Sequence, residues 1–295
     1  MSALCVVGAS GSPKVLKLAL DFVLPYEKRC CALFQRIINH DNSVHIIIEK
    51  GTLNSWHPLV HGVFTYSGQG RLVFCCLPEQ TTEVSLALTE FFAKNSVFCI
   101  SGQKEWADFL EEIVSGIYRG RKSEVHEYHF MEEGRDLEAM DKDEDDFSHR
   151  SDCEIIRCSK NHIEQLMPLQ LDYTRVEVLP AWREVVPAAE RISLEKNFKN
   201  QFYFAVVEKG KIVSKANTNA ITKGFFQIGG VYTLEEFRGK GYASALVEHI
   251  AREACLLNRK AVLFVKKENA GAIKAYTKAG FIITGGYKIV YYLEK

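Results

Sequence analysis

A run of charge, EEGRDLEAMDKDEDD, occupies residues 132–146 and interrupts the chain near its middle. It has few apolar residues, so it cannot bury itself in a core. We therefore predict a solvated linker over 132–152, although an acidic docking tail for a basic partner is an alternative. With 295 residues, 47% of them hydrophobic, the chain has enough apolar material for two domains, expected at 1–131 and 153–295.

The charge balance argues against a nucleic-acid partner. Lys plus Arg number 37 and Asp plus Glu also number 37, whereas proteins that bind polyanions usually carry a basic excess. The distribution is uneven, with 15 basic and 23 acidic residues in 1–152 and 22 and 14 in 153–295. No tRNA or DNA partner is expected.

The apolar residues and cysteines predict a cytoplasmic protein without a membrane span. No stretch of 18 consecutive apolar residues occurs, and the short apolar start lacks a basic leader. The nine cysteines are odd in number, and two adjacent pairs lie in apolar runs, which favours buried, reduced thiols. Cys153, Cys158 and His162 come closest to a metal pattern but lack a fourth ligand, so we predict no metal site.

Hydrophobic periodicity predicts a mixed α/β domain before the linker. The expected helices lie in 13–39, broken by Pro25, and at 83–94 and 104–118, and the expected strands lie at 45–48, 62–66, 71–77 and 97–100. The opening Val6 to Lys14 superficially resembles a strand and a phosphate loop. Its spacing is not that of a P-loop, so we interpret it as a capped helix start.

After the linker, the order of elements is a β-meander, then βαβα, then two strands. Helices are expected at 160–173, from Pro187, at 241–257 and at 270–279, and strands at 202–208, 211–216, 224–227, 230–233, 261–266, 281–284 and 288–293. Lys209-Gly210 is a hairpin signal. The predicted fold class is α/β (α+β), with a mixed sheet flanked by helices.

A glycine-bearing turn joins a predicted strand directly to a predicted helix. The N–H groups of a first helical turn, aided by the helix dipole, bind pyrophosphate, and glycines let the backbone approach it closely. The cationic side chains of the turn add positive charge. We predict a pyrophosphate site made by Arg238, Gly239, Lys240, Gly241, Tyr242 and Ala243.

These residues resemble the acyl-CoA signature of the GCN5-related N-acetyltransferase (GNAT) superfamily, through Arg238, Gly241 and Ala243. The resemblance continues in ENAGAIKAYTKAGF, similar to the family's second acyl-CoA segment, through Asn269 and Tyr276. It is specific over 229–281 and plausible over 153–295. Asn269 also suits a helix N-cap, and Tyr276 lies about two helical turns further along the same face.

The resemblance implies acyl transfer from a CoA thioester, acetyl-CoA foremost, to an amine. A backbone N–H near Val231 would stabilise the oxyanion, and Val231 and Thr233 would hydrogen-bond the pantetheine arm. Tyr276 would protonate the departing thiolate. The general base has no fixed residue in the family; Glu236 and its neighbour Glu235, and Glu177, are weak candidates, and a water relay is equally compatible.

The function predicted from the sequence is therefore an N-acyltransferase acting on a small-molecule or peptide amine. A CoA-binding regulatory module without turnover is the alternative, and a tRNA-dependent transferase is a third reading that the neutral charge disfavours. The element order in 13–131 is loosely similar to that of 153–295, which suggests a degenerate second GNAT-like copy. The acceptor, the acyl chain length and the oligomeric state, monomer or homodimer, stay open.

Overall fold

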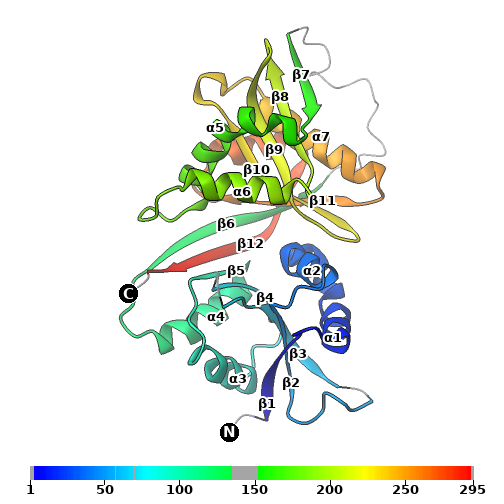
Figure 1. Cartoon of the computed structure of the whole chain (residues 1–295), viewed down its shortest axis with the longest axis vertical. Coiled ribbons are helices and arrows are strands. Elements are labelled where there is room, and N and C mark those ends of the chain that lie inside the picture. Colours follow the sequence, from blue (N-terminus) through cyan, green and yellow to red (C-terminus); the bar gives the residue numbers. More distant parts are fainter. Residues whose placement is uncertain (1–2, 57, 69–70, 135–151, 294–295) are drawn as a thin grey trace. The chain divides into compact units, whose positions relative to one another are not determined.

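The computed structural model describes residues 3–56, 58–68, 71–134 and 152–293 (Figure 1). The chain forms two compact units, the first made of Met1–His129 with Gly285–Lys295 and the second of Phe130–Thr284. Strands β6 (Ser123–Glu133) and β12 (Phe281–Tyr292) each run from one unit into the other. The first unit therefore contains residues from both ends of the sequence.

The sheet of the first unit has the strand order β1-β2-β3-β4-β5-β12. Its pairs are antiparallel except for β4 with β5, which is parallel. The strands besides β12 are β1 (Leu4–Gly8), β2 (Val44–Glu49), β3 (Val60–Thr65), β4 (Leu72–Cys76) and β5 (Cys99–Gln103). The sequence of β2, VHIIIE, explains why this segment forms a strand. It is rich in β-branched residues, which favour strands and are mostly buried here.

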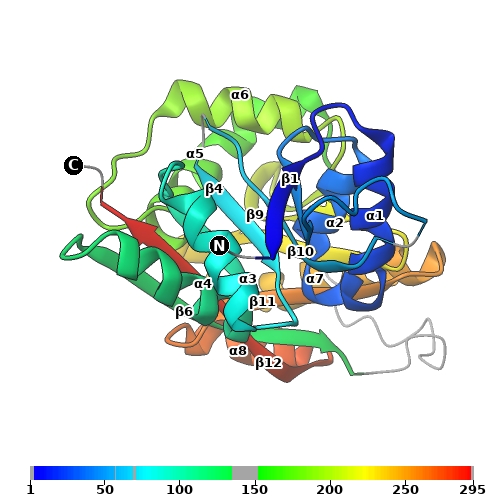
Figure 2. The ribbon, with the colours of Figure 1, turned by 90° about the horizontal axis from the view of Figure 1, so that it is seen from below.

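Figure 2 shows helices α1 and α2 on one side of these strands and α3 and α4 on the other. The helices are α1 (Pro13–Val23), α2 (Cys31–Ile38), α3 (Thr82–Phe92) and α4 (Lys104–Ile117), and a 3₁₀ turn, Leu24–Arg29, separates the first two. Ser12 caps α1 by accepting a hydrogen bond from the Val15 N–H, and Pro13 occupies the first helical position. Asn42 Oδ1 accepts from the Gly11 N–H at 3.1 Å.

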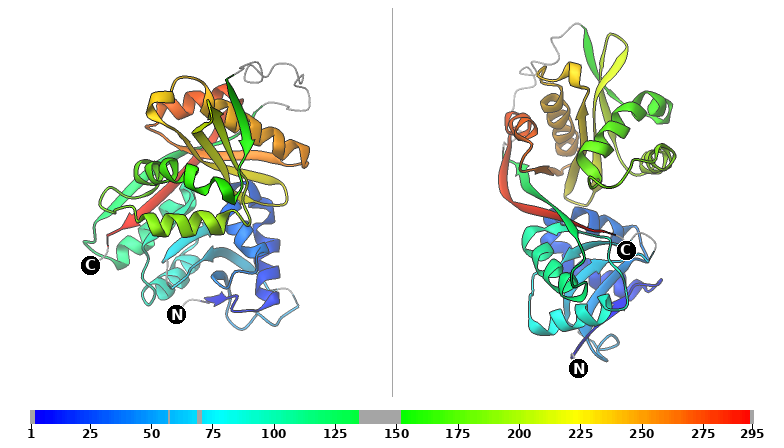
Figure 3. Two further views of the ribbon diagram at one scale, coloured as in Figure 1. Left: turned by 45° about the horizontal axis from the view of Figure 1, so that its top comes forward. Right: turned by 90° about the vertical axis from the view of Figure 1, so that its left-hand side faces the viewer.

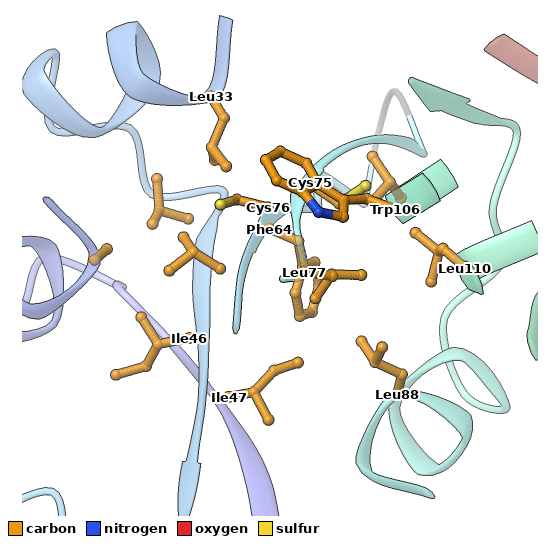
Figure 4. Close-up of a cluster of buried hydrophobic side chains, with 14 of the residues drawn as sticks. Leu33, Ile46, Ile47, Phe64, Cys75, Cys76, Leu77, Leu88, Trp106 and Leu110 are labelled. Atoms are coloured by element: carbon orange, nitrogen blue, oxygen red, sulfur yellow. The ribbon is translucent and has the colours of Figure 1, made fainter. Parts of the chain in front are cut away.

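The core of the first unit lies between its sheet and its helices (Figure 4). Leu33, Ile46, Phe64 and Trp106 are buried there beside several cysteines. The cysteines of the described residues are free thiols. Burial raises the pKa of Cys75 to about 12, so these side chains act as small neutral hydrophobes.

The sheet of the second unit has the order β6-β11-β10-β9-β8-β7. Its strands besides β6 are β7 (Cys153–Arg157), β8 (Tyr203–Glu208), β9 (Lys211–Ile221), β10 (Phe225–Thr233) and β11 (Lys260–Lys266). The pairs β7–β8, β8–β9 and β9–β10 are antiparallel, and β10–β11 is parallel. The tight β8–β9 hairpin turns at Lys209 and Gly210, both with positive φ, as predicted.

Helices cover both faces of this second sheet (Figure 3, right). On one face α5 (Ile163–Tyr173) and α6 (Pro187–Asn197) enclose one apolar cluster, and on the other α7 (Tyr242–Leu256) and α8 (Ala270–Lys278) enclose another. Proline opens α6 and glycine follows α8, as the sequence indicated. The α5 helix continues into a π-helical turn, Thr174–Val178.

The mixed α/β class is confirmed, and several local predictions need correction. The opening segment holds both a strand, β1, and a capped helix start, whereas only the second was favoured. Two expected pairs of strands are single strands, β10 and β12, because Gly229-Gly230 and Gly285-Gly286 continue them. Strands β6 and β7, beside the acidic run, were not predicted. β6 includes Glu132 and Glu133, and residues 135–151 of the expected linker lie outside the described residues.

Candidate functional site

Strand β10 loses one of its two neighbours, β11, halfway along its length and keeps the other, β9. It pairs with β11 only from Phe225 to Ile228, and its register with β9 breaks between Gly229 and Tyr232. Gly230 has a φ of 62°, a conformation that side chains disfavour. The final part of β10, from Gly229 to Thr233, thus diverges from β11, so the two strands are splayed apart there.

The glycines of the splay are required by the asparagines of β9. A Cβ at Gly229 would lie 2.0 Å from the Asn219 amide nitrogen, and one at Gly230 would lie 1.8 Å from Asn217 Oδ1. The two asparagine side chains are themselves joined by a hydrogen bond of 3.0 Å from Asn217 Nδ2 to Asn219 Oδ1. The side chains of β9 therefore occupy the space where β10 has none.

The predicted phosphate loop follows the splayed strand and opens α7. A 3₁₀ turn, Glu235–Phe237, leads to Arg238, and Gly239 and Gly241 have φ values of 79° and 82°. Gly241 occupies the N-cap position, and no side chain caps α7. Residues 238–241 are exposed, so the loop that leads into the first turn of α7 lies at the surface.

The two cationic side chains of this loop are held differently. The Arg238 guanidinium lies 5.7 Å from the centre of the Tyr232 ring, and its Nε donates to the Thr233 carbonyl at 3.2 Å. Lys240 Nζ forms an ion pair of 2.9 Å with Glu208, which also accepts from the Tyr242 hydroxyl at 2.7 Å. Hydrogen bonds from Tyr242 and Lys240 hold the pKa of Glu208 below its usual value, so Glu208 is ionised and binds the Lys240 ammonium.

The second predicted segment lies at the start of α8. Asn269 caps this helix, as expected, by accepting from the Ala272 N–H at 3.0 Å, and its Nδ2 donates to Glu177 at 3.2 Å. Tyr276 is buried, with 7% of its surface exposed. Burial raises the pKa of Tyr276, and nearby Tyr173 and Glu177 raise it further, so the hydroxyl stays protonated near neutral pH.

The three carboxylates considered as bases lie in different surroundings. Glu235 and Glu236 are exposed, and Glu236 is 3.6 Å from Lys211 Nζ. Glu177 is partly buried and lies 3.6 Å from Lys266 Nζ in addition to its bond with Asn269. The structure thus brings Glu177 together with Asn269 and Tyr276, while the two loop carboxylates face solvent.

Sequence reasoning missed one part of this region, a buried lysine beside the splay. Lys215 of β9 is 1% exposed, and its Nζ donates to the Gly230 carbonyl at 2.9 Å. Nζ also lies 4.7 Å from the centre of the Tyr173 ring, whose hydroxyl accepts from the Gly230 N–H at 3.3 Å. The Gly229-Gly230 pair was a usable signal for a bulge, whereas nothing in the sequence marks Lys215 as buried.

Two negative findings apply to the residues that the structure describes. Within them, no set of three His, Cys, Asp or Glu side chains is placed to bind a metal ion. None of the described helices combines the length and apolar character that crossing a bilayer requires.

Residues 164–281 match the model of the acetyltransferase (GNAT) family. The matched range holds the splayed strand, the glycine loop and the Asn269–Tyr276 segment. This part of the chain is a GNAT domain, as the resemblance of its sequence motifs implied. No curated protein matches the chain by sequence.

Solved structures show the same fold over nearly the whole chain. A tandem GNAT protein from the clavulanic acid biosynthesis pathway has a TM-score of 0.60 and 11% identity, with 99% of both chains covered. A Drosophila protein has a TM-score of 0.61 and 10% identity, again with 99% of both chains covered. A GNAT-family acetyltransferase from Colwellia psychrerythraea has a TM-score of 0.53 and 9% identity, with 98% of this chain and 99% of that chain covered. A tandem fold is consistent with a GNAT-like N-terminal half.

Proposed function

We propose that the chain is an acyl-CoA-dependent N-acyltransferase that moves acetyl from acetyl-CoA to an amine of a small molecule or peptide. One observation carries the proposal. A splayed strand ends in an exposed glycine loop that opens a helix without a side-chain cap, within a GNAT domain. This is the arrangement that lets backbone N–H groups bind a pyrophosphate.

Each part of the loop has a role in holding acetyl-CoA. The N–H groups of residues 239–243 would bind its pyrophosphate, assisted by Arg238. Lys240 contributes through its pair with Glu208, which fixes the loop, rather than as a free cation. The backbone of Val231 and Thr233 would hydrogen-bond the pantetheine arm. Acetyl-CoA, when bound, supplies a reactive acyl thioester.

The residues of this chain would then assist the transfer in two places. The Val231 N–H, on the splayed part of β10, would donate to the oxygen that gains negative charge. Tyr276 would protonate the departing sulfur, and its raised pKa keeps a proton available near neutral pH. The amine proton would pass to water or to Glu177, since Glu235 and Glu236 lie exposed on the surface.

The first experiment is thermal unfolding with and without excess acetyl-CoA. At 100 times Kd, a ligand stabilises the folded state by about 2.7 kcal/mol, which raises the midpoint by several degrees. We expect this rise in the wild type and its loss in Arg238→Glu. Lys199→Glu, an equal charge change at an exposed position just after α6, should keep the rise.

The outcomes separate the readings. If neither acetyl-CoA nor a second acyl-CoA shifts the midpoint, the loop does not bind CoA and the proposal is wrong. If the shift occurs but no amine from a library promotes release of the CoA thiol, the chain is a binding module without turnover. The N-terminal half lacks the pattern Arg-x-x-Gly-x-Gly or Arg-x-x-Gly-x-Ala that residues 238–243 carry, so we assign CoA binding to the second unit alone.

A further inference from the structure

The peptide group between Gly230 and Val231 carries two polar atoms with separate tasks. Its oxygen, on Gly230, accepts the hydrogen bond of 2.9 Å from Lys215 Nζ. Its N–H, on Val231, is the donor proposed above for the developing oxyanion. The bond is trans, so the N–H points away from the oxygen and from Lys215.

A hydrogen bond to a peptide oxygen polarises the whole peptide group and strengthens its N–H as a donor. The effect is larger when the donor is charged and the surroundings exclude water. Lys215 meets both conditions when protonated, because it is 1% exposed and lies over the Tyr173 ring. The Tyr173 hydroxyl, which accepts from the Gly230 N–H, fixes the preceding peptide group.

We propose that Lys215 is a positioning residue that polarises the Gly230–Val231 peptide and so makes the Val231 N–H a stronger oxyanion donor. This inference rests on the proposed function, since it assigns a partner to the donor named there. It uses no covalent step: Lys215 keeps its bonds throughout and acts only through the Gly230 carbonyl.

The charge of Lys215 is set by its surroundings. Titratable groups come from each element packed on its face of the sheet: Tyr173 from α5, Glu190 from α6, Cys158 after β7, Tyr203 from β8 and Tyr232 from β10. Burial lowers the pKa of Lys215 from 10.5 to about 7, although Glu190 and Cys158 oppose this. The ammonium therefore dominates below neutral pH and the amine above it.

This titration separates the proposal from another role for the same residue. A polarising ammonium helps most below pH 7 and loses its effect as pH rises. A lysine that acted as general base would help only once deprotonated, so its contribution would rise with pH. The two roles predict opposite signs for the same variant.

The first test needs no ligand and reads the Val231 amide directly. The full chain is labelled with ¹⁵N-valine, and the Val231 resonance is identified by its loss in Val231→Ile. We expect this resonance to move with a midpoint near pH 7 in the wild type. In Lys215→Met the movement should vanish, and in Lys215→Arg the resonance should stay near the position it has at low pH.

The second test compares kcat/KM of the wild type and Lys215→Met across pH. Dividing kcat/KM of the wild type by that of Lys215→Met at each pH cancels the ionisation of the amine substrate, which is common to both enzymes. We expect a ratio of about tenfold below pH 7, smaller than the 10²–10³ lost with an oxyanion donor itself, and a fall toward one above pH 8. Lys211→Met, on the same strand but exposed and paired with Glu236, is the control and should match the wild type.

Each outcome decides the inference. A Val231 resonance that does not respond to pH, or that responds equally in Lys215→Met, overturns it. A kinetic ratio that is flat or rises with pH also overturns it, and a rising ratio assigns Lys215 as the base. If the wild type never consumes acetyl-CoA, the proposed function fails, while the Val231 titration still reports whether Lys215 polarises the peptide.

Discussion

Among the described residues, each unit buries one lysine in its sheet, and the surroundings of the two lysines shift their pKa values in opposite directions. Lys288 of β12, in the first unit, is 8% exposed and contacts two carboxylates, Asp108 at 2.7 Å and Glu111. Burial alone would lower the pKa of Lys288, but its hydrogen bonds to both carboxylates outweigh burial and raise it. Lys215, in the second unit, contacts a carbonyl and an aromatic ring instead.

Glu190, the carboxylate that raises the pKa of Lys215, is hydrogen-bonded to other side chains. Glu190 accepts hydrogen bonds from Thr174 Oγ1 at 2.9 Å and from Gln170 Nε2 at 3.0 Å. The charge of Glu190 raises the pKa of Lys215, but burial outweighs it and the pKa is lowered. The comparison teaches that a buried lysine with carboxylates serves the fold, whereas one left without them sits where chemistry is proposed.

The largest expected difference between the units concerns two buried tyrosines. Tyr276→Phe should lower turnover by about 10²–10⁴, the range of general acid catalysis, while acetyl-CoA still raises the unfolding midpoint. In the first unit, the Tyr287 hydroxyl shares a hydrogen bond of 2.8 Å with Ser101, so Tyr287→Phe should cost about 1 kcal/mol of stability and leave turnover unchanged. Equal turnover in both variants would remove Tyr276 from the mechanism. Thiol release and thermal melts provide the measurements.

The next effect is on stability, and its sign is unusual for a lost hydrogen bond. Below pH 7 Lys215 is protonated both folded and unfolded, so the folded state bears the full cost of a buried charge. Lys215→Met should therefore stabilise the protein by about 2–3 kcal/mol there. Between pH 7 and about 10.5 only the unfolded state keeps the proton, so the wild type gains and the difference shrinks. Urea unfolding at pH 6, 8 and 10 measures this, and a destabilised variant at pH 6 would contradict it.

A further effect on stability, opposite in sign, is expected at the paired lysine. Lys288→Met leaves Asp108 and Glu111 without their shared cation and should destabilise the protein by about 1–3 kcal/mol at pH 7. The pKa of Lys288 is raised, so its stabilisation persists through neutral pH and is lost only as pH rises above 10.5. The same urea series checks both lysines, and a stabilised Lys288→Met would erase the contrast between the units.

The sequence predicts most of the elements because their patterns are local. The Ser12–Pro13 start of α1, the Asn269 cap of α8 and the Lys209-Gly210 hairpin are each determined by a few adjacent residues. Strands β6 and β7 were not predicted because charged and polar residues interrupt their apolar patterns. Their strand conformation depends on pairing with neighbouring strands of the sheet.

The site is predictable only where backbone geometry leaves a trace in the sequence. Glycines mark the loop before α7 because positive φ requires them. The partner of each charged side chain, in contrast, depends on residues far apart in the sequence. Lys240 forms an ion pair with Glu208, which lies 32 residues earlier, and Lys215 contacts Gly230 only because β9 and β10 pair with a bulge. The roles assigned to Tyr276, Val231 and Glu177 remain predictions.

The membership of residues 285–295 in the first unit has a consequence for synthesis. During translation, the chain from Met1 to His129 emerges first, yet its sheet still lacks the strand that pairs with β5. That strand is made only after the entire second unit. The nascent first half therefore presents an open sheet edge for the time needed to translate more than 150 residues, an edge of the kind that other chains pair with unless it is shielded.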